Sequence, residues 1–264
     1  MASTYAFGNE REVQRERLRT LEALFDPWTT DRLEARGVGP GWSCLEVGAG
    51  GGSIAAWLCD RVGPDGTVLA IDLDTTVVAE VTRPNLEVRV HDVLEDGLPA
   101  SAFDLIHLRM VLAWLPRAGT AIERLVAALK PGGWLVAEEM DFTTAAPDPR
   151  MGPEDRARLE GIVAAHNAIL AQRNAFDPFY GRRVAGDLAD SGLAECGCEG
   201  RVSMWRGGEA GGRAWALTIT QLRDAMVEAA LIDAAEVDAA LELFGSSRMH
   251  AMSPLMMGSW GRRA

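Results

Sequence analysis

A glycine-rich turn at residues 48–52 constrains the fold of this chain more than any other feature. Residues 44–47 before it are short and mostly apolar, which predicts a buried strand. Glycine permits positive φ and a close approach of backbone to a ligand. Residues 53–62 after the turn have the apolar face of a helix, which Ser53 is expected to cap. A strand, a glycine turn and a helix N-terminus in this order suit a nucleotide-like ligand.

An acidic residue follows this turn at a sequence separation that indicates a function. Val68–Ile71 is a second apolar strand, and it ends on Asp72. An acid about 20 residues after such a turn is typical of a contact with ribose hydroxyls. Asp74 is the competing candidate. A dinucleotide fingerprint would need a third glycine where this chain has Ser53, which disfavours a nicotinamide cofactor.

Further strands and helices alternate along the chain. Apolar strands are predicted at 86–90, 103–108, 130–139, 199–205 and 255–262. Helices are predicted at 118–129 and near 183–191. Alternation of this kind predicts an α/β protein with a mostly parallel sheet.

Five motifs in the right order resemble the class I S-adenosylmethionine-dependent methyltransferases, in particular the UbiE-like small-molecule branch. The resemblance is strong over residues 40–142. It rests on Glu46-Val-Gly-Ala-Gly-Gly-Gly, Asp72, His91-Asp-Val, Phe103-Asp-Leu-Ile and Leu129-Lys-Pro-Gly-Gly. It implies a Rossmann-like, seven-stranded, mostly parallel sheet with helices on both faces and S-adenosyl-L-methionine as cofactor. S-adenosyl-L-homocysteine would be the product.

The resemblance also implies a cofactor site. The acid after the third strand would bind the adenine amino group, and the next amide would read the ring. Arg109 would either pair with the methionine carboxylate or brace a loop acid. Relatives often carry histidine where this chain has Trp114, which removes one general base. The cofactor-binding residues implied are Glu46, Gly48, Ala49, Gly50, Asp72, Leu73, Asp92, Val93, Leu108 and Arg109.

The chain is expected to form a single methyltransferase domain with a helical cap. The core is placed at 38–142, 181–206 and 254–264, and the cap at 143–180 and 207–253, from insertions after strands five and six. N-terminal helices are expected over 9–37, with Asp26-Pro27 breaking them into two. Tyr5 and Phe7 are expected either in a loose chain end or in an aromatic lid.

Methyl transfer is a direct displacement, so the protein must mainly align the reactants and exclude water. A base is needed only if the acceptor loses a proton. His166 lies on the apolar face of the cap helix predicted at 154–173, where it is either a base or a core histidine. Glu139 and Asp141 leave the carboxyl end of strand five. These three are the catalytic candidates, with Tyr180 and His250 behind them.

Composition excludes several classes of partner. The net charge of −12 disfavours nucleic acid and anionic membrane surfaces. No run reaches the roughly 20 apolar residues of a membrane helix. Four cysteines without C-x-x-C spacing indicate neither a metal site nor a disulfide framework. We expect a cytoplasmic protein with a small-molecule acceptor, and a homodimer as an option.

The function expected is methyl transfer to a small-molecule acceptor, with O-methylation of a specialised metabolite favoured. The same cofactor fold can also serve a non-methylating cyclase or isomerase, or a cofactor-binding protein without catalysis. A nicotinamide-dependent dehydrogenase is a weaker alternative.

Overall fold

A computed structural model describes residues 11–173 and 176–264. Its contacts divide the chain into two compact units. The sheet unit comprises residues 25–139, 180–200 and 257–264, and the helical unit comprises the described residues up to 24, 140–179 and 201–256. Tyr5 and Phe7 lie outside the described residues. The prediction of a single domain with a helical cap stays a prediction.

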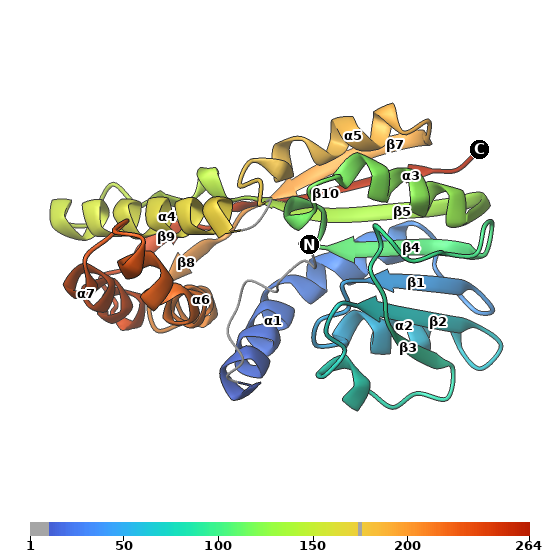
Figure 1. The fold of residues 1–264 in the computed structure, drawn as a ribbon, viewed down its shortest axis with the longest axis horizontal. Helices are drawn as coiled ribbons and strands as arrows, with labels where there is room; N and C mark the ends of the chain where they lie inside the picture. The colour runs from blue at the N-terminus through green and yellow to red at the C-terminus, as the bar shows by residue number, and fades with distance from the viewer. Residues whose placement is uncertain (1–10, 174–175) are drawn as a thin grey trace. The chain divides into compact units, whose positions relative to one another are not determined.

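The sheet unit is built on a seven-stranded sheet in the order β3-β2-β1-β4-β5-β10-β7 (Figure 1). The four pairings from β3 to β5 are parallel. Strand β10 runs antiparallel to β5. The evidence is that Gly132 N–H, near the start of β5, donates to Arg263 O, just beyond the end of β10, at 2.8 Å. The strands are β1 (Ser43–Val47), β2 (Thr67–Asp72), β3 (Leu86–Val90), β4 (Phe103–Arg109), β5 (Leu129–Asp141), β7 (Ala194–Arg201) and β10 (Leu255–Arg262).

Helices cover both faces of this sheet, as expected. Helix α2 (Ser53–Val62) lies on one face, and α3 (Ala118–Ala128) and α5 (Val184–Asp190) lie on the other (Figure 1). Short 3₁₀ turns, η1 (Val78–Glu80), η2 (Leu112–Trp114) and η4 (Tyr180–Arg182), complete the connections. The prediction of a Rossmann-like α/β fold is confirmed.

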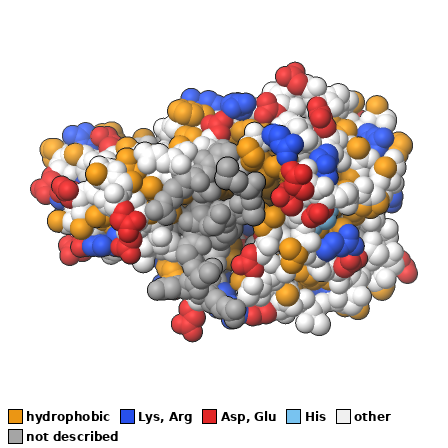
Figure 2. Space-filling model, viewed as in Figure 1, with side chains coloured by type: hydrophobic (Ala, Val, Ile, Leu, Met, Phe, Trp, Pro, Cys, Tyr) orange, Lys and Arg blue, Asp and Glu red, His pale blue; other side chains and the backbone are white. Residues whose placement is uncertain are grey.

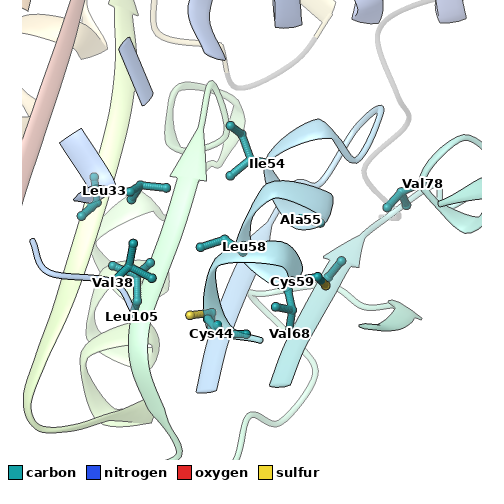
Figure 3. Packing of buried hydrophobic residues seen from close by; sticks show 13 residues of the cluster. Leu33, Val38, Cys44, Ile54, Ala55, Leu58, Cys59, Val68, Val78 and Leu105 are labelled. Carbon is teal, nitrogen blue, oxygen red and sulfur yellow. The ribbon is translucent and has the colours of Figure 1, made fainter. Parts of the chain in front are cut away.

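The core of the sheet unit packs α2 against the strands beneath it. Strand residues point alternately to the two faces, so every second side chain joins this layer. Figure 3 shows side chains from α2 meeting those of β1, β2 and β4 there, together with the end of α1 (Arg11–Ala35). The fully or nearly fully buried members include Leu33, Val38, Cys44, Ile54, Leu58, Val68 and Leu105.

The first helix differs from the prediction. Asp26-Pro27 does not break it, because α1 runs without interruption from Arg11 to Ala35 with Pro27 inside. Proline removes one backbone hydrogen bond and crowds the preceding turn. Beyond it, Thr29 and Arg32 both bond to the Glu138 side chain, and these buried contacts offset that loss.

Besides residues 11–24 of α1, the described part of the helical unit contains three further helices and a small antiparallel sheet. The helices are α4 (Pro153–Arg173), α6 (Ala210–Glu228) and α7 (Ala234–Gly245), which pack on one another. The turn η3 (Phe142–Thr144) precedes β6 (Ala146–Pro147), and this strand joins β8 (Met204–Arg206) and β9 (His250–Met252) in the order β6-β9-β8. The sequence predicted the helices but missed this sheet, whose strands span only two or three residues.

Strand six is also corrected. The single strand predicted at 199–205 is two strands in different sheets, β7 at the edge of the large sheet and β8 in the small one. Its apolar residues mark β8, where Trp205 is buried. Strand β7 is an edge strand with mostly exposed side chains, so it carries no apolar signal.

Charged side chains are spread over the surface. On the face that Figure 2 shows, Lys and Arg side chains lie interspersed with those of Asp and Glu. Among residues 11–173 and 176–264, no helix combines the length and the apolar character that crossing a membrane requires.

Candidate functional site

The glycine-rich turn at residues 48–52, the glycine corner, connects β1 to α2 and is hydrogen-bonded to the carboxyl end of β2. Gly48 and Ala49 N–H both donate to Ile71 O, at 2.8 and 3.1 Å. Gly48 has φ +68°. A Cβ there would collide with Val111 Cγ2, so only glycine fits between the turn and the loop after β4. The cap of α2 is Gly52 in the left-handed region, and Ser53 is the first helical residue rather than the cap.

Asp72 is part of this corner. Its Oδ2 accepts from Gly50 N–H at 2.9 Å, and its Oδ1 accepts from Asp74 N–H at 3.1 Å. Burial raises the pKa of Asp72, while these N–H bonds act in the opposite direction. Carboxylate oxygens together accept about four hydrogen bonds, so capacity for ligand hydroxyls remains. Leu73 beside it is 43 % exposed.

The loop after β3 lies next to Asp72. His91 N–H donates to Asp72 O at 3.0 Å, which brings the two acidic positions together at one edge of the sheet. Asp92 Oδ1 accepts from Leu94 N–H at 2.8 Å and so fixes the loop around Val93. The His91 ring is buried near Gly97 O, which fits the structural reading of that histidine.

A buried charge network lies on the face of the sheet that α1 covers. Glu46 on β1, His107 on β4 and Glu138 on β5 point to this face. His107 Nδ1 lies 2.7 Å from Glu46 Oε2. Glu138 is paired with Arg32 and accepts from Thr29 Oγ1 at 2.5 Å. The three strand residues are at most 4 % exposed.

This network holds its charges through mutual pairing. Burial alone would lower the pKa of His107, but Glu46 and Glu138 outweigh it and raise that pKa to about 9. Burial would raise the pKa of Glu138, yet His107, Arg32 and Arg109 lower it to about 2. Burial raises the pKa of Glu46, against the attraction of His107. The glutamate predicted to bind cofactor is therefore bonded to a histidine that the sequence analysis did not single out.

Arg109 belongs to the same region. Its Nη1 donates to Thr29 Oγ1 and its Nη2 to Asp26 Oδ1, both at 2.8 Å. The acid that Arg109 braces is thus Asp26 on helix α1, and not the loop acid that the sequence predicted. Leu108 before it is fully buried in β4. A contact between Arg109 and the cofactor stays a prediction.

Glu139 points to the opposite face from Glu138, because neighbours along a strand alternate. It is fully buried, and its Oε1 accepts from Val111 N–H at 2.9 Å and Leu112 N–H at 2.6 Å. Burial raises its pKa to about 8 although these N–H bonds favour the charged form. Tyr180 lies in the same unit and donates its hydroxyl to Asp187 at 2.7 Å.

The other two catalytic candidates belong to the helical unit. Asp141 is buried and caps η3, accepting from Thr143 N–H at 3.0 Å and from its hydroxyl at 2.5 Å. His166 on α4 is 2 % exposed, and its Nδ1 lies 2.9 Å from Asn167 Oδ1. Its ring centroid lies 5.2 Å from Trp215 and 5.5 Å from Phe142. Burial lowers the pKa of His166 to about 4.

The structure therefore groups the predicted cofactor residues and Glu139 in the sheet unit, and His166 and Asp141 in the helical unit. His107, Glu138 and Arg32 were missed. The signal that could have found two of them is a charged residue interrupting an apolar strand. In the described part of the chain, no three His, Cys, Asp or Glu side chains are placed to hold a metal ion.

Comparison with known proteins finds methyltransferases. The model of a methyltransferase domain matches residues 45–137. The relative "Methyltransferase str2" of Strobilurus tenacellus is 31% identical over 174 residues, which cover 66% of this chain and 61% of that protein. Nocamycin O-methyltransferase of Saccharothrix syringae is 29% identical over 174 residues, covering 59% of this chain and 60% of that protein. The chain thus spans about three fifths of the length of these relatives.

Solved structures share the fold. The protein BH2331 of Bacillus halodurans C-125 has a TM-score of 0.56 at 12% identity, covering 89% of this chain and 97% of that one. The [4+2]-cyclase SpnF has a TM-score of 0.50 at 15% identity, covering 89% and 79%. Residues 45–137 are therefore similar to a methyltransferase domain, and the relatives named here are methyltransferases, a class of enzyme whose cofactor is S-adenosylmethionine. Ubiquinone/menaquinone biosynthesis C-methyltransferases named UbiE are also among its relatives.

Proposed function

We propose that this protein transfers a methyl group from S-adenosylmethionine to a small-molecule acceptor, with O-methylation of a specialised metabolite favoured. The observation that carries the proposal is the glycine corner with the Asp72 carboxylate bonded into it through Gly50 N–H. A turn without β-carbons allows a close approach of ligand, and the acid offers acceptors for ribose hydroxyls. A cytoplasmic location and a homodimer remain part of this proposal.

The hydrogen-bonding groups of the glycine corner and of the loop after β3 match those of the cofactor. We assign the ribose hydroxyls to Asp72 and the adenine amino group to Asp92, with the amide of Val93 reading the ring. The backbone of Gly48, Ala49 and Gly50 would line the rest of the cofactor, beside Leu73 and the end of β4 at Leu108. When bound, S-adenosylmethionine supplies an electrophilic methyl group. The protein's own task is to orient the acceptor and exclude water.

Among the catalytic candidates, we propose His166 as the base if the acceptor must lose a proton. A pKa of about 4 leaves this imidazole neutral at pH 7, with a free ring nitrogen lone pair, and makes it a weaker base than an exposed histidine. Glu139 and Asp141 each hold backbone N–H groups, which favours a positioning role for both.

Names of relatives support the acceptor class. One relative is named an O-methyltransferase for nocamycin, which fits a specialised metabolite as acceptor. The fold alone does not separate methyl transfer from cyclisation, since the [4+2]-cyclase SpnF shares it.

The test is product analysis with methyl-labelled S-adenosylmethionine and a panel of phenolic, carboxylic and polyketide acceptors. Label in an acceptor whose mass has gained one CH₂ group supports methyl transfer. An isomeric product without label would favour the cyclase alternative. The variant His166→Ala should keep cofactor binding and lose turnover, and retained turnover would remove His166 as the base.

A further inference from the structure

We propose that Glu139 is a positioning residue. Its carboxyl group holds the loop from Met110 to Ala113 against the glycine corner and so shapes the surface that binds the cofactor. This inference rests on the proposed function, because it assumes that the corner binds the cofactor. It assigns Glu139 a role that acts through the loop rather than on the acceptor.

The first argument is the placement of Glu139. Strand alternation sends Glu138 into the charge network under α1 and Glu139 to the other face, where η2 lies. There a single oxygen, Oε1, accepts from two successive amides, Val111 N–H at 2.9 Å and Leu112 N–H at 2.6 Å. Two donors on one acceptor oxygen tie both amides to the same point of β5. Glu139 thus fixes the backbone of the loop at the point where it leaves β4.

The second argument is the backbone of the loop itself. Met110 has φ +56°, in a region that non-glycine residues rarely adopt. Its N–H donates to Glu138 O at 2.8 Å, one residue before the glutamate that binds the next two amides. Such a conformation persists only where surrounding bonds enforce it. Successive residues of β5 supply those bonds.

The third argument links the loop to the glycine corner. Val111 fills the space that a β-carbon of Gly48 would occupy, so its side chain lies directly on the turn. A shift of Val111 would therefore change the surface on which the cofactor rests. Glu139 reaches the corner through one intervening residue.

The carboxyl of Glu139 also has an unused oxygen. Its Oε2 is buried and has no hydrogen-bond partner among the described residues. An amide could replace the carboxylate, keep the oxygen that accepts from the loop, and place its NH₂ group at the Oε2 position. This makes Glu139→Gln a conservative variant with a defined expectation.

The experiment measures the Kd of S-adenosylhomocysteine by calorimetry, well below the Tm of each variant. Glu139→Leu should weaken binding about tenfold or more, because the loop loses both bonds. Glu139→Gln should stay within about threefold of the wild type. Glu139→Asp keeps the carboxyl group but withdraws it by one methylene, so it should weaken binding. It provides a second test if the leucine variant does not fold. The expected order of affinity is Gln above Asp above Leu.

A matched control separates positioning from general stability. Val62→Ala removes buried atoms at the far end of α2, away from the corner. It should lower the Tm and leave the Kd unchanged. Wild-type affinity in both Glu139→Leu and Glu139→Asp would overturn the inference while leaving the proposed function intact. No binding by the wild type would instead overturn the proposed function, and this inference with it.

Discussion

At the scale of single residues, the buried network under α1 depends most on Glu138. It is 1 % exposed and contacts Thr29 and Arg32, with His107 Nε2 at 3.9 Å. Replacing Glu138 by alanine leaves Arg32 and the imidazolium of His107 buried without this carboxylate. Arg32 keeps Glu199 at 2.8 Å and His107 keeps Glu46 at 2.7 Å, so each buried cation loses only one of its two partners. We therefore expect a loss of about 1–3 kcal/mol in the free energy of unfolding.

Denaturant titration measures this loss. The matched control is Glu34→Ala. Glu34 lies on α1, like Arg32, and forms an exposed ion pair with Arg61 at 3.9 Å. An exposed pair contributes about 0–1 kcal/mol. Equal effects of the two substitutions would contradict the importance assigned to the buried network.

His166 gives the protein a pH dependence of definite sign. Its pKa is lowered from 6.5 to about 4 in the folded state, chiefly by burial, with Asn167 and Arg17 as further influences. The native state therefore binds fewer protons than the unfolded state between these values, so stability falls as the pH falls from about 6.5 through about 4. Unfolding curves of His166→Gln should lack this part of the acid loss. Parallel pH profiles for wild type and variant would disprove the assignment.

Asp72 is the residue on which the cofactor assignment depends. Asp72→Ala removes the acceptor of Gly50 N–H and the proposed acceptor for ribose, so we expect the affinity for S-adenosylhomocysteine to fall by about a hundredfold. Asp74→Ala changes the neighbouring acid, the competing candidate, and should have a much smaller effect. Calorimetric titration of both variants decides between them, and the reverse order would move the ribose contact to Asp74.

At the scale of elements, the turn after β1 is the most restricted segment. Gly48→Ala adds a β-carbon that collides with Val111, in a backbone with φ +68°. Gly63→Ala is the matched control, since Gly63 has φ +69° with nothing within 4 Å of its β-carbon position. Gly63 has ψ −171°, a conformation that glycine adopts far more readily than other residues, so the control should cost about 1–3 kcal/mol of stability from backbone conformation alone, measured by thermal unfolding. Gly48→Ala should cost more and abolish cofactor binding.

A second substitution should restore part of the stability that Gly48→Ala loses. Val111→Ala in the Gly48→Ala background removes the colliding methyl groups and should recover part of the lost stability. Equal stability of the Gly48→Ala and Gly63→Ala variants would show that the contact between loop and turn is not tight.

Elements with strong local signals were predictable from the sequence. Strands β1, β2 and β4 and helix α2 carry clear runs of apolar residues, so their positions followed directly from residue pattern. Helix α1 was not predicted as one element, because proline at position 27 is a local signal that tertiary contacts of Thr29 and Arg32 override. Strands β6, β8 and β9 are too short to carry a periodic pattern.

The candidate site was predictable only in part. Gly48, Asp72 and Asp92 stand at strand ends, so topology alone brings them to one edge of the sheet. The partners of Glu46 and Arg109 come from β4 and α1, far away in sequence, and only the register of the strands reveals them. Glu139 accepts hydrogen bonds from two amides of the loop after β4, and no residue pattern indicates that contact.

At the scale of the whole molecule, the chain passes between the two units five times, at residues 24–25, 139–140, 179–180, 200–201 and 256–257. Neither unit is a continuous segment, which explains why composition gave no boundary. The residues assigned to the cofactor all belong to the sheet unit. The affinity for the cofactor should therefore depend on the glycine corner in the sheet unit, and His166→Ala in the helical unit should leave it unchanged.

The most direct test of the central claim is calorimetry of the intact chain with S-adenosylmethionine and with S-adenosylhomocysteine. The account predicts that both bind at one site per chain, with affinities in the micromolar range and the product bound as tightly as the cofactor or more so. Titration of Asp72→Ala under the same conditions should give little heat. Absence of binding for both ligands in the folded wild type would contradict the account and leave residues 48–52 as an ordinary glycine turn.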